Sequence, residues 1–431
     1  MTSICGRRRD FTGTSVAART SRDGRCRPIA RRFAFARGWF PSGNYLSSGI
    51  RHSLASNQQV LTNVTGMSKT TRIFGALAGA AVLVAGFGAL TPATAGTGQL
   101  RLVAQSESVV WNAVAADHGR VFVAGPRWSG STGPAVGLVT ADGGVAPYPD
   151  AAWNAWHPGA AADTAFVNVN SINLDGRGDL WVVDTGAPTF GGDPLPGGAK
   201  LVRVDVTSNR VTRVYPFGPD VAPPGSYLDD VRFNGGTAYL TDAGRPGLIV
   251  LNLGTGAARR VLDGHPSTTA PADRPIVVDG TVVRGADDTP LKVNADPLEL
   301  SPDRRWLYYG PLSGPWSRVP TRGLDDPQLS PAQLAAQVRP WADLPPTGGT
   351  AMDRRGNLYF SDLAHDSIMR RSPDGRITQL IQDPRLHWVD APFLDGHDTL
   401  WLPVPQLDRA APFNDGISRI HFPVQLLRLK L

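Results

Sequence analysis

The sequence predicts an all-β domain over residues 96–431, a six-bladed β-propeller with four-stranded antiparallel blades. Two observations predict it: a hairpin pattern that recurs six times, and a spacing between copies that suits a blade. Each copy has a β-rich run, a turn rich in Asp and Gly, and a second run that carries an aromatic residue. The copies lie at residues 111–125, 170–186, 228–244, 295–310, 348–362 and 390–404.

The spacing of the copies gives the size and number of the units. One aromatic residue in each second run marks the copy: Phe122, Trp181, Tyr239, Tyr308, Tyr359 and Trp401. Successive markers are on average about 56 residues apart, so six units fill the 336 residues after residue 95. Four short strands in about 50 residues are typical of a propeller blade, whereas a series of two-sheet sandwiches would not explain so regular a repeat.

Further elements follow from local patterns. Outer strands are expected at 201–206, 211–215 and 247–251, and a Ser-Pro start predicts one short inserted helix over residues 330–338. The loops 187–199 and 263–292, rich in Gly, Pro and Asp, are expected to rise over one face. A strand at 99–103 should pair with one at 424–429, which would close the ring and remove an exposed sheet edge.

The first 95 residues have the layout of an export signal behind an extension. Residues 67–95 combine a basic start, an uncharged stretch and small residues before Gly96, as a secretory signal peptide does. A membrane anchor is the alternative, but the cleavage site favours removal. We therefore expect a secreted protein, extracellular or periplasmic, with no stable membrane insertion. Residues 1–66 are interpreted as a misplaced gene start, with Met67 as the true one, or as a disordered arm.

Charge and cysteine content exclude several classes of function. Residues 1–95 hold 13 of the 43 Lys and Arg residues and two of the 37 acidic ones, which leaves 30 basic and 35 acidic side chains in the body. A mildly acidic body does not suit nucleic-acid binding. Both cysteines, Cys5 and Cys26, lie in the leader, so the body has no disulfide, thiolate metal site or cysteine nucleophile.

The aligned hairpins place polar residues in one register. The position lies four residues before the apolar residue that precedes each turn, and it holds Asn or Asp in five of the six hairpins, where a strand would favour Val, Ile or Thr. The six residues are Asn112, Asn170, Asp229, Asp296, Gly348 and Asp390. If the hairpins are the inner strands of the blades, these side chains ring one mouth of the central channel. Such a ring suits Ca²⁺ or another divalent cation, with Asp229, Asp296 and Asp390 as ligands. Without a cation or protons, the three carboxylates would repel one another.

The same mouth is a candidate for a small-molecule site. Asn112, Asn170, Asp230 and Trp388 are predicted to bind the ligand, with Asp230 either a direct ligand or an orienting neighbour. Trp111 and Trp128 are further candidates for an aromatic wall, and His387 either reaches the mouth or is a loop histidine. The alternative at each Asn or Asp alone is a turn-capping role.

Several stretches resemble the major royal jelly protein / Yellow family, in its bacterial branch. They include PYPDAAWN (147–154), DLWVVDTG (179–186), AYLTDAGRPGLIVLNL (238–253), LSPDRRWLYYGPLSG (300–314) and HWVDAPFLDGHDTLWLPVPQLDR (387–409). Together the matching stretches cover residues 100–410 in the family's order. The resemblance implies a secreted six-bladed propeller and no single shared activity, because the family includes ligand-binding proteins and others linked to dopachrome conversion.

A more distant resemblance is to the gluconolactonase/regucalcin group of metal-dependent lactonases. It places Asn112 at a metal-binding Glu, Asp296 at a metal-binding Asn, and Gly348 at the metal-binding Asp that also acts as the base. A lactonase without that carboxylate lacks a group for general base catalysis. We therefore expect a propeller that binds a small molecule such as an aromatic amine or a catechol-like compound. The alternative is a metal-dependent enzyme of lactonase or dopachrome-tautomerase type, and a protein-interaction platform has only the fold to support it.

Overall fold

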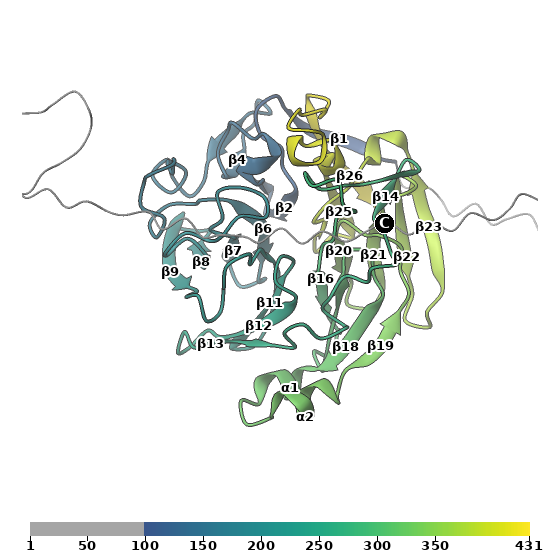
Figure 1. The fold of residues 1–431 in the computed structure, drawn as a ribbon. Coiled ribbons are helices and arrows are strands. Elements are labelled where there is room, and N and C mark those ends of the chain that lie inside the picture. The colour runs from purple at the N-terminus through teal and green to yellow at the C-terminus, as the bar shows by residue number, and fades with distance from the viewer. Residues whose placement is uncertain (1–98) are drawn as a thin grey trace, which may run out of the picture. The chain divides into compact units, whose positions relative to one another are not determined.

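The computed structural model describes residues 99–431, which form a ring of six four-stranded antiparallel sheets (Figure 1). The six-bladed propeller predicted from the repeats is confirmed. The predicted extension at 1–66 and the predicted signal peptide at 67–95 lie outside the described residues. Within 99–431, no helix has the length and apolar character needed to cross a bilayer.

Each blade begins at the central channel with the first strand of a predicted hairpin and continues outward. Blade 1 contains β2 (Ala113–Asp117), β3 (Arg120–Ala124), β4 (Val136–Val139) and β5 (Val145–Pro147). Blade 2 contains β6 (Val169–Leu174), β7 (Asp179–Asp184), β8 (Lys200–Asp205) and β9 (Arg210–Pro216). Blade 3 contains β10 (Leu228–Asn234), β11 (Thr237–Asp242), β12 (Gly247–Asn252) and β13 (Ala258–Val261).

The second half of the ring repeats this order and closes it. Blade 4 contains β16 (Ala295–Leu300), β17 (Trp306–Pro311), β18 (Trp316–Pro320) and β19 (Arg339–Ala342). Blade 5 contains β20 (Thr350–Met352), β21 (Leu358–Asp362), β22 (Ser367–Arg371) and β23 (Ile377–Gln382). Blade 6 contains β24 (Phe393–Leu394), β25 (Thr399–Val404), β26 (Val424–Lys430) and, outermost, the N-terminal strand β1 (Arg101–Ser106).

The closure of the ring follows the prediction. Strand β1 pairs antiparallel with β26, with Arg101 opposite Arg428 and Ser106 opposite Val424. The first and last strands therefore share one sheet, so the two ends of the described chain hold each other in place. The backbone groups of β26 are bonded on both sides, which leaves no open edge at the join.

Helices are few. The predicted helix is α2 (Pro331–Ala335), where Ser330 and Gln333 form a reciprocal capping box. A second short helix, α1 (Thr321–Asp325), was not predicted, and both lie between β18 and β19 of blade 4. Four 3₁₀ turns complete the elements of residues 99–431: η1 (Arg127–Ser129), η2 (Pro384–Leu386), η3 (Leu407–Arg409) and η4 (Ala411–Phe413).

The apolar core is divided into clusters between neighbouring blades. Between blades 1 and 2, for example, Phe122 packs with Val169, and between blades 3 and 4 Tyr239 packs with Leu298. Burying each such side chain contributes about 1.5–3 kcal/mol. The aromatic markers that defined the repeat thus hold adjacent blades together, which leaves the channel lining free for polar residues.

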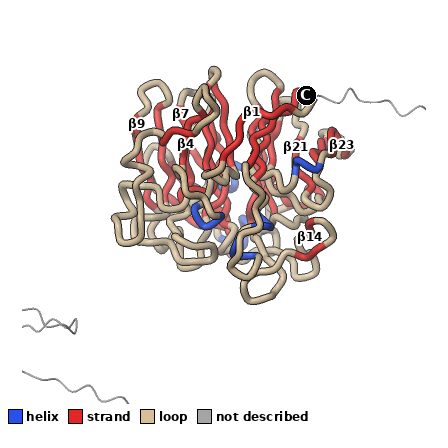
Figure 2. Tube along the Cα trace, turned by 90° about the horizontal axis from the view of Figure 1, so that it is seen from above, coloured by secondary structure: helices blue, strands red, loops and turns tan. Residues whose placement is uncertain are grey.

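One face of the ring carries most of the long loops (Figure 2). The segment between β13 and β16 contains a small two-stranded sheet, β14 (Val277–Val278) and β15 (Thr281–Val282). We call residues 262–294 the β14–β15 insertion. Together with the loop between β7 and β8, it rises over one mouth of the channel, as predicted, because both segments line the cavity described below.

Candidate functional site

The polar ring lies where the inner strands begin, and β-bulges aim its side chains. The pairing of β6 with β7 shifts register between Val169 and Ser171, that is, at Asn170. Strand β10 shifts between Leu228 and Val231, and strand β16 between Ala295 and Leu298. Bulges re-aim side chains and are frequent beside active sites. They explain why the start of three inner strands can carry Asn or Asp toward the channel.

Hydrogen bonds link part of the ring into a chain. Asn112 Nδ2 donates to Asn170 Oδ1 at 3.2 Å, and Asn170 Nδ2 donates to Asp229 Oδ1 at 2.8 Å. The hydroxyl of Tyr227 also donates to Asn170 Oδ1 at 2.9 Å. The two amides are thereby fixed in orientation, so that Asn170 presents a donor to the first of the carboxylates.

Three carboxyl groups complete the mouth, and we call Asp229, Asp296 and Asp390 the mouth carboxylates. Burial, and then repulsion from Asp390 and Asp230, raises the pKa of Asp229 well above its usual range. Burial and the charge of Asp229 raise the pKa of Asp296 in the same way, and a hydrogen bond between the two favours a proton on Asp296. No basic side chain in the described part of the chain forms an ion pair with any of the three.

Asp390 belongs to the segment that packs against Gly348, the one ring position without a polar side chain. A Cβ atom at Gly348 would lie only 2.5 Å from the carbonyl oxygen of Val389, so the backbone before blade 6 packs directly on this glycine. Asp390 Oδ1 accepts a hydrogen bond from the N–H of Ala391 at 2.9 Å, and Oδ2 accepts one from the Trp388 indole at 3.2 Å. Burial raises the pKa of Asp390 to about 7 in spite of these two donors.

The mouth carboxylates face a cavity of about 290 Å³. Its lining includes one basic residue, the exposed Lys292, and five aromatic ones, Trp128, Phe190, Tyr227, Trp388 and Phe413. The rings of Trp128 and Phe190 are 4.8 Å apart between centroids, and those of Phe190 and Phe413 are 5.0 Å apart. Trp128 also donates its indole N–H to the Tyr227 hydroxyl at 2.8 Å. Trp128 lies in η1, Phe190 in the β7–β8 loop and Phe413 in η4, so three separate loops form this wall.

The structure separates the predicted ligand-binding residues into two groups. Asn170 and Trp388 line the cavity together with all three mouth carboxylates. Asn112 does not line it, because it is buried behind Asn170. Asp230 also does not line it, because its carboxylate points to the guanidinium of Arg232, 2.7 Å away.

Asp230 belongs to an ion-paired network in the channel. Arg232 pairs with Asp230 on one side and with both carboxylate oxygens of Glu299 on the other, at 2.8 and 3.1 Å. The hydroxyl of Thr350 donates a further hydrogen bond to Glu299 at 3.1 Å. We call Asp230, Arg232, Glu299 and Thr350 the channel network. Its acidic groups all have partners, so we assign it a structural role.

Two aromatic or imidazole candidates do not reach the mouth. Trp111 is buried in the core between blades 6 and 1, and its indole donates to the carbonyl of Gln425 at 2.9 Å. His387 does not line the cavity either; it is 4% exposed and bonds Asp408 through Nε2 at 2.9 Å. Burial lowers the pKa of His387, but Asp366 and Asp408 outweigh this effect and raise it to about 9.

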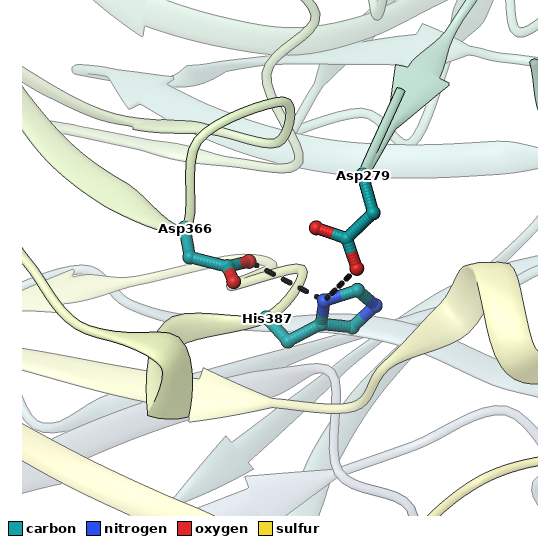
Figure 3. Close-up of side chains that lie close together, drawn as sticks. All are labelled: Asp279, Asp366 and His387. Carbon is teal, nitrogen blue, oxygen red and sulfur yellow. Dashed lines mark ion pairs between the residues drawn. The ribbon is translucent and has the colours of Figure 1, made fainter. Parts of the chain in front are cut away.

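The predicted Ca²⁺ site stays a prediction. In residues 99–431, the one set of three or more His, Cys, Asp or Glu residues whose ligand atoms lie within 4.8 Å of one another is Asp279, Asp366 and His387 (Figure 3). The mouth carboxylates do not form such a set. A cation held there would need oxygen atoms from other groups or from water.

Several cavity residues carried no sequence signal strong enough to single them out. Phe190 lies in a loop predicted to rise over the mouth, and Tyr227 precedes the ring residue Asp229 by two positions. Phe413 lies in a segment between β25 and β26 with no repeat pattern. Comparing the loops after each hairpin for exposed aromatic residues could have found the first two.

Comparisons with known proteins identify one family and several distant structures. The family described as major royal jelly protein matches residues 167–386. A virginiamycin B lyase from Staphylococcus aureus is 12% identical, with 77% of this chain and 99% of that chain covered and a TM-score of 0.44. A protein provisionally named a gluconolactonase is 13% identical, with 78% and 92% covered and a TM-score of 0.46. Likenesses at this level define neither a ligand nor a reaction.

A third similar structure is that of an auxiliary nutrient-binding protein from Bacteroides thetaiotaomicron. It is 9% identical, with 75% of this chain and 69% of that chain covered and a TM-score of 0.40. No curated protein matches the sequence.

Proposed function

The chain belongs to the major royal jelly protein family, and on that premise we propose that it is a secreted propeller that binds a small aromatic amine in the cavity at the channel mouth. The observation that carries the proposal is the set of three buried carboxyl groups without a cationic partner, opposite an aromatic wall. An organic cation would supply the missing positive charge and leave an aromatic body against the wall.

The mouth carboxylates are the reason for proposing a ligand with an amine. A buried carboxylate without a partner costs free energy, and an ammonium group within hydrogen-bonding distance offsets that cost. An ammonium has three donors, which matches three acceptor groups from Asp229, Asp296 and Asp390. Binding would also release the proton that Asp229 and Asp296 share, because a cation favours both ionised forms.

The aromatic residues of the cavity and its volume are the reasons for proposing a ligand that is aromatic and small. Trp128, Phe190 and Phe413 are tilted or edge-on to one another, an arrangement that can add a further ring at favourable geometry. A cavity of about 290 Å³ is at the small end of ligand sites, which begin at roughly 300 Å³. It would therefore take a compact molecule with one ring system. A catechol amine meets the same requirements.

Secretion is part of the proposal because of the sequence before the domain. Residues 67–95 have the layout of a signal peptide. Expression of residues 67–431 with a C-terminal epitope, followed by N-terminal sequencing of the exported product, tests it. A mature terminus at Gly96 is the expected result, and retention of residues 67–95 in the membrane fraction would contradict it.

Calorimetry on purified residues 96–431 tests the ligand class. Tryptamine is the probe, and N-acetyltryptamine and indole-3-propionic acid are its neutral and anionic matches. We expect tryptamine to bind at least tenfold more tightly than the neutral match, since one charged hydrogen bond contributes about 1.5–3 kcal/mol. Equal affinity for all three would mean that the carboxylates do not select the ligand.

A second function, proton transfer on the bound molecule, is favoured by one observation. The pKa of Asp390 is raised to about 7, near the pH at which a general acid or base works best. Isomerisation of a dopachrome-type substrate would use such a group, whereas lactone hydrolysis has no carboxylate at Gly348. Turnover of dopachrome with a bell-shaped pH profile that Asp390→Asn abolishes would establish the isomerase, and absence of turnover leaves binding as the function.

A further inference from the structure

A second cluster of charged side chains lies outside the cavity and joins the β14–β15 insertion to blades 5 and 6. Asp279 comes from the two-residue turn between β14 and β15, and Asp366 from the turn between β21 and β22. His387 follows η2, and Asp408 lies in η3. Figure 3 shows both carboxylates, Asp279 and Asp366, directed at the same nitrogen of His387.

The two nitrogens of His387 have different surroundings. Nε2 lies 2.9 and 3.0 Å from the two carboxylate oxygens of Asp408, which is an ordinary hydrogen-bond distance. Nδ1 lies 3.3 Å from Asp366 Oδ1 and 3.6 Å from Asp279 Oδ2. A charged N–H···O⁻ bond is usually about 2.7–2.9 Å long, so both distances at Nδ1 are too long for a good hydrogen bond.

A buried atom without a partner lies at the same place. Asp366 Oδ1 has no access to solvent and no hydrogen-bond partner. It faces Nδ1 of a histidine side chain that is itself 94% buried. Two polar atoms therefore point at a common space without satisfying each other, and a third, from Asp279, borders that space.

We propose that Asp279, Asp366 and His387 form a zinc site, in which Asp408 orients the histidine ring. Zinc bonds to imidazole nitrogen and carboxylate oxygen are about 2.0–2.2 Å long, so ligand atoms around a tetrahedral zinc lie roughly 3.3–3.5 Å apart. The observed separations from Nδ1, 3.3 and 3.6 Å, match that spacing. The three ligand atoms all lie within 4.8 Å of one another.

Asp408, which contacts the other nitrogen of His387, supports the zinc assignment. A histidine that binds a metal through one nitrogen usually donates its other N–H to a carboxylate, which fixes the ring and raises its basicity. Asp408 holds that position at Nε2. Imidazole with two carboxylates suits Zn²⁺ better than Ca²⁺, which prefers six or more oxygen atoms. The fourth position is left to water.

The site would fasten the insertion to the ring beside the cavity. Asp279 is the one ligand from the insertion, whose later residues Leu291 and Val293 line the cavity. His387 immediately precedes Trp388, which lines the cavity from another segment of the chain. A zinc ion would therefore connect two walls of the cavity without contacting its ligand.

Matched Asp-to-Asn variants test the site on tag-free residues 96–431. Asp279 and Asp366 both have a positive φ, +49° and +45°, and Asn tolerates this backbone well, so Asp279→Asn and Asp366→Asn should fold. Asp288→Asn is the matched control, since Asp288 has a φ of +60°, lies in the same insertion, and its carboxylate is 91% exposed. Circular dichroism and tryptamine binding check the fold of each protein.

Calorimetry with Zn²⁺ and elemental analysis after dialysis are the readouts. We expect one zinc per chain for the unchanged protein and for Asp288→Asn, with the melting temperature about 5 °C higher at a hundredfold excess over the Kd. Asp279→Asn and Asp366→Asn should each weaken zinc binding at least tenfold, and Ca²⁺ should not compete. No zinc bound to the unchanged protein, or equal binding by all four proteins, would overturn the site and leave His387 as an ion-paired imidazolium.

Digestion with trypsin tests independently whether zinc holds the β14–β15 insertion to the ring. Arg284 lies in the insertion with its side chain 48% exposed. Zinc should slow cleavage after Arg284 severalfold in the unchanged protein and in Asp288→Asn, and should leave the rate in Asp279→Asn unchanged. The same protection in Asp279→Asn would mean that zinc acts elsewhere.

Discussion

The mouth carboxylates and the channel network lie in the same channel and differ in what balances their charge. Asp229 and Asp230 are neighbours in sequence, at the same bulge of β10, yet they belong to different clusters. Asp230 and Glu299 share the buried guanidinium of Arg232. Asp229, Asp296 and Asp390 have only amide, indole and backbone donors and one another.

We interpret this difference as one between a structural cluster and a candidate binding site. In the channel network both carboxylates share one guanidinium, so removing Arg232 leaves two buried carboxylates without a cation. At the mouth the three carboxyl groups are buried without a cation in the free protein; burial, and then repulsion from neighbouring carboxylates, raises their pKa values and costs stability. Such a cost is typical of a binding site that a ligand completes.

The sharpest test of the comparison is Arg232→Met. It would leave Asp230 and Glu299 buried without a cation, and we expect the free energy of unfolding to fall by about 3–5 kcal/mol in urea denaturation at pH 7. Asp296→Asn, which removes a repelling charge, should leave that free energy unchanged or raise it. Similar losses in the two variants would abolish the distinction between the clusters.

The next largest effect concerns ligand affinity. Asp296→Asn combined with Asp390→Asn should weaken tryptamine binding about a hundredfold, since two charged hydrogen-bond acceptors are lost. Its fold, followed by the melting temperature, should be retained. Asp287→Asn combined with Asp288→Asn, two exposed changes in the β14–β15 insertion, is the control for altered net charge. Unchanged affinity in the double variant would place the ligand elsewhere.

A smaller effect is expected from Gly348→Ala. The new methyl group would meet the Val389 carbonyl at 2.5 Å and displace the segment that carries Asp390. We expect a loss of about 1–3 kcal/mol in unfolding free energy, as for other overpacked sites, together with weaker tryptamine binding. Gly396→Ala, where nothing lies within 4 Å of the added atom, is the matched control. If both variants behave alike, close packing at Gly348 does not position Asp390.

The smallest effect is the pH dependence of tryptamine affinity. With a pKa of about 7, Asp390 becomes protonated as the pH falls through 7, while the amine keeps its charge. As the pH is raised toward 7, ionisation of Asp390 should therefore increase the affinity for tryptamine by up to tenfold per pH unit, and this contribution of Asp390 should level off above pH 7. The same dependence in Asp390→Asn would assign the titration to another group.

The stability of the free domain should depend on pH in the opposite direction: it should fall as the pH rises, whereas ligand affinity increases. Because the pKa of Asp390 is raised on folding, from 3.8 to about 7, its neutral form stabilises the fold below pH 4, and this contribution is lost as the pH rises to 7. The difference in unfolding free energy between the unchanged protein and Asp390→Asn, measured from pH 4 to 8, isolates this term. A difference that does not change with pH would contradict the raised pKa.

Much of the fold was predictable because it repeats. Six hairpins in one register identified the inner strands, and the polar ring followed from residues that a strand would not favour, such as Asp229 and Asp296. The pairing of β1 with β26 followed from the need to close the ring. The second helix, α1, was missed because a five-residue segment has no periodicity to detect.

The sequence by itself determined the architecture and pointed to the mouth as the candidate site, since both depend on residue types at regular spacing along the chain. Tertiary structure decided which polar residues share a cluster. Asp229 and Asp230 differ by one position, and only the bulge and the place of Arg232 send one to the cavity and the other to the channel network. It likewise decided that Phe190 and Phe413 meet Trp128, and that His387 meets Asp279 and Asp366, because these contacts join segments far apart in the chain, where no local pattern records the distance between them.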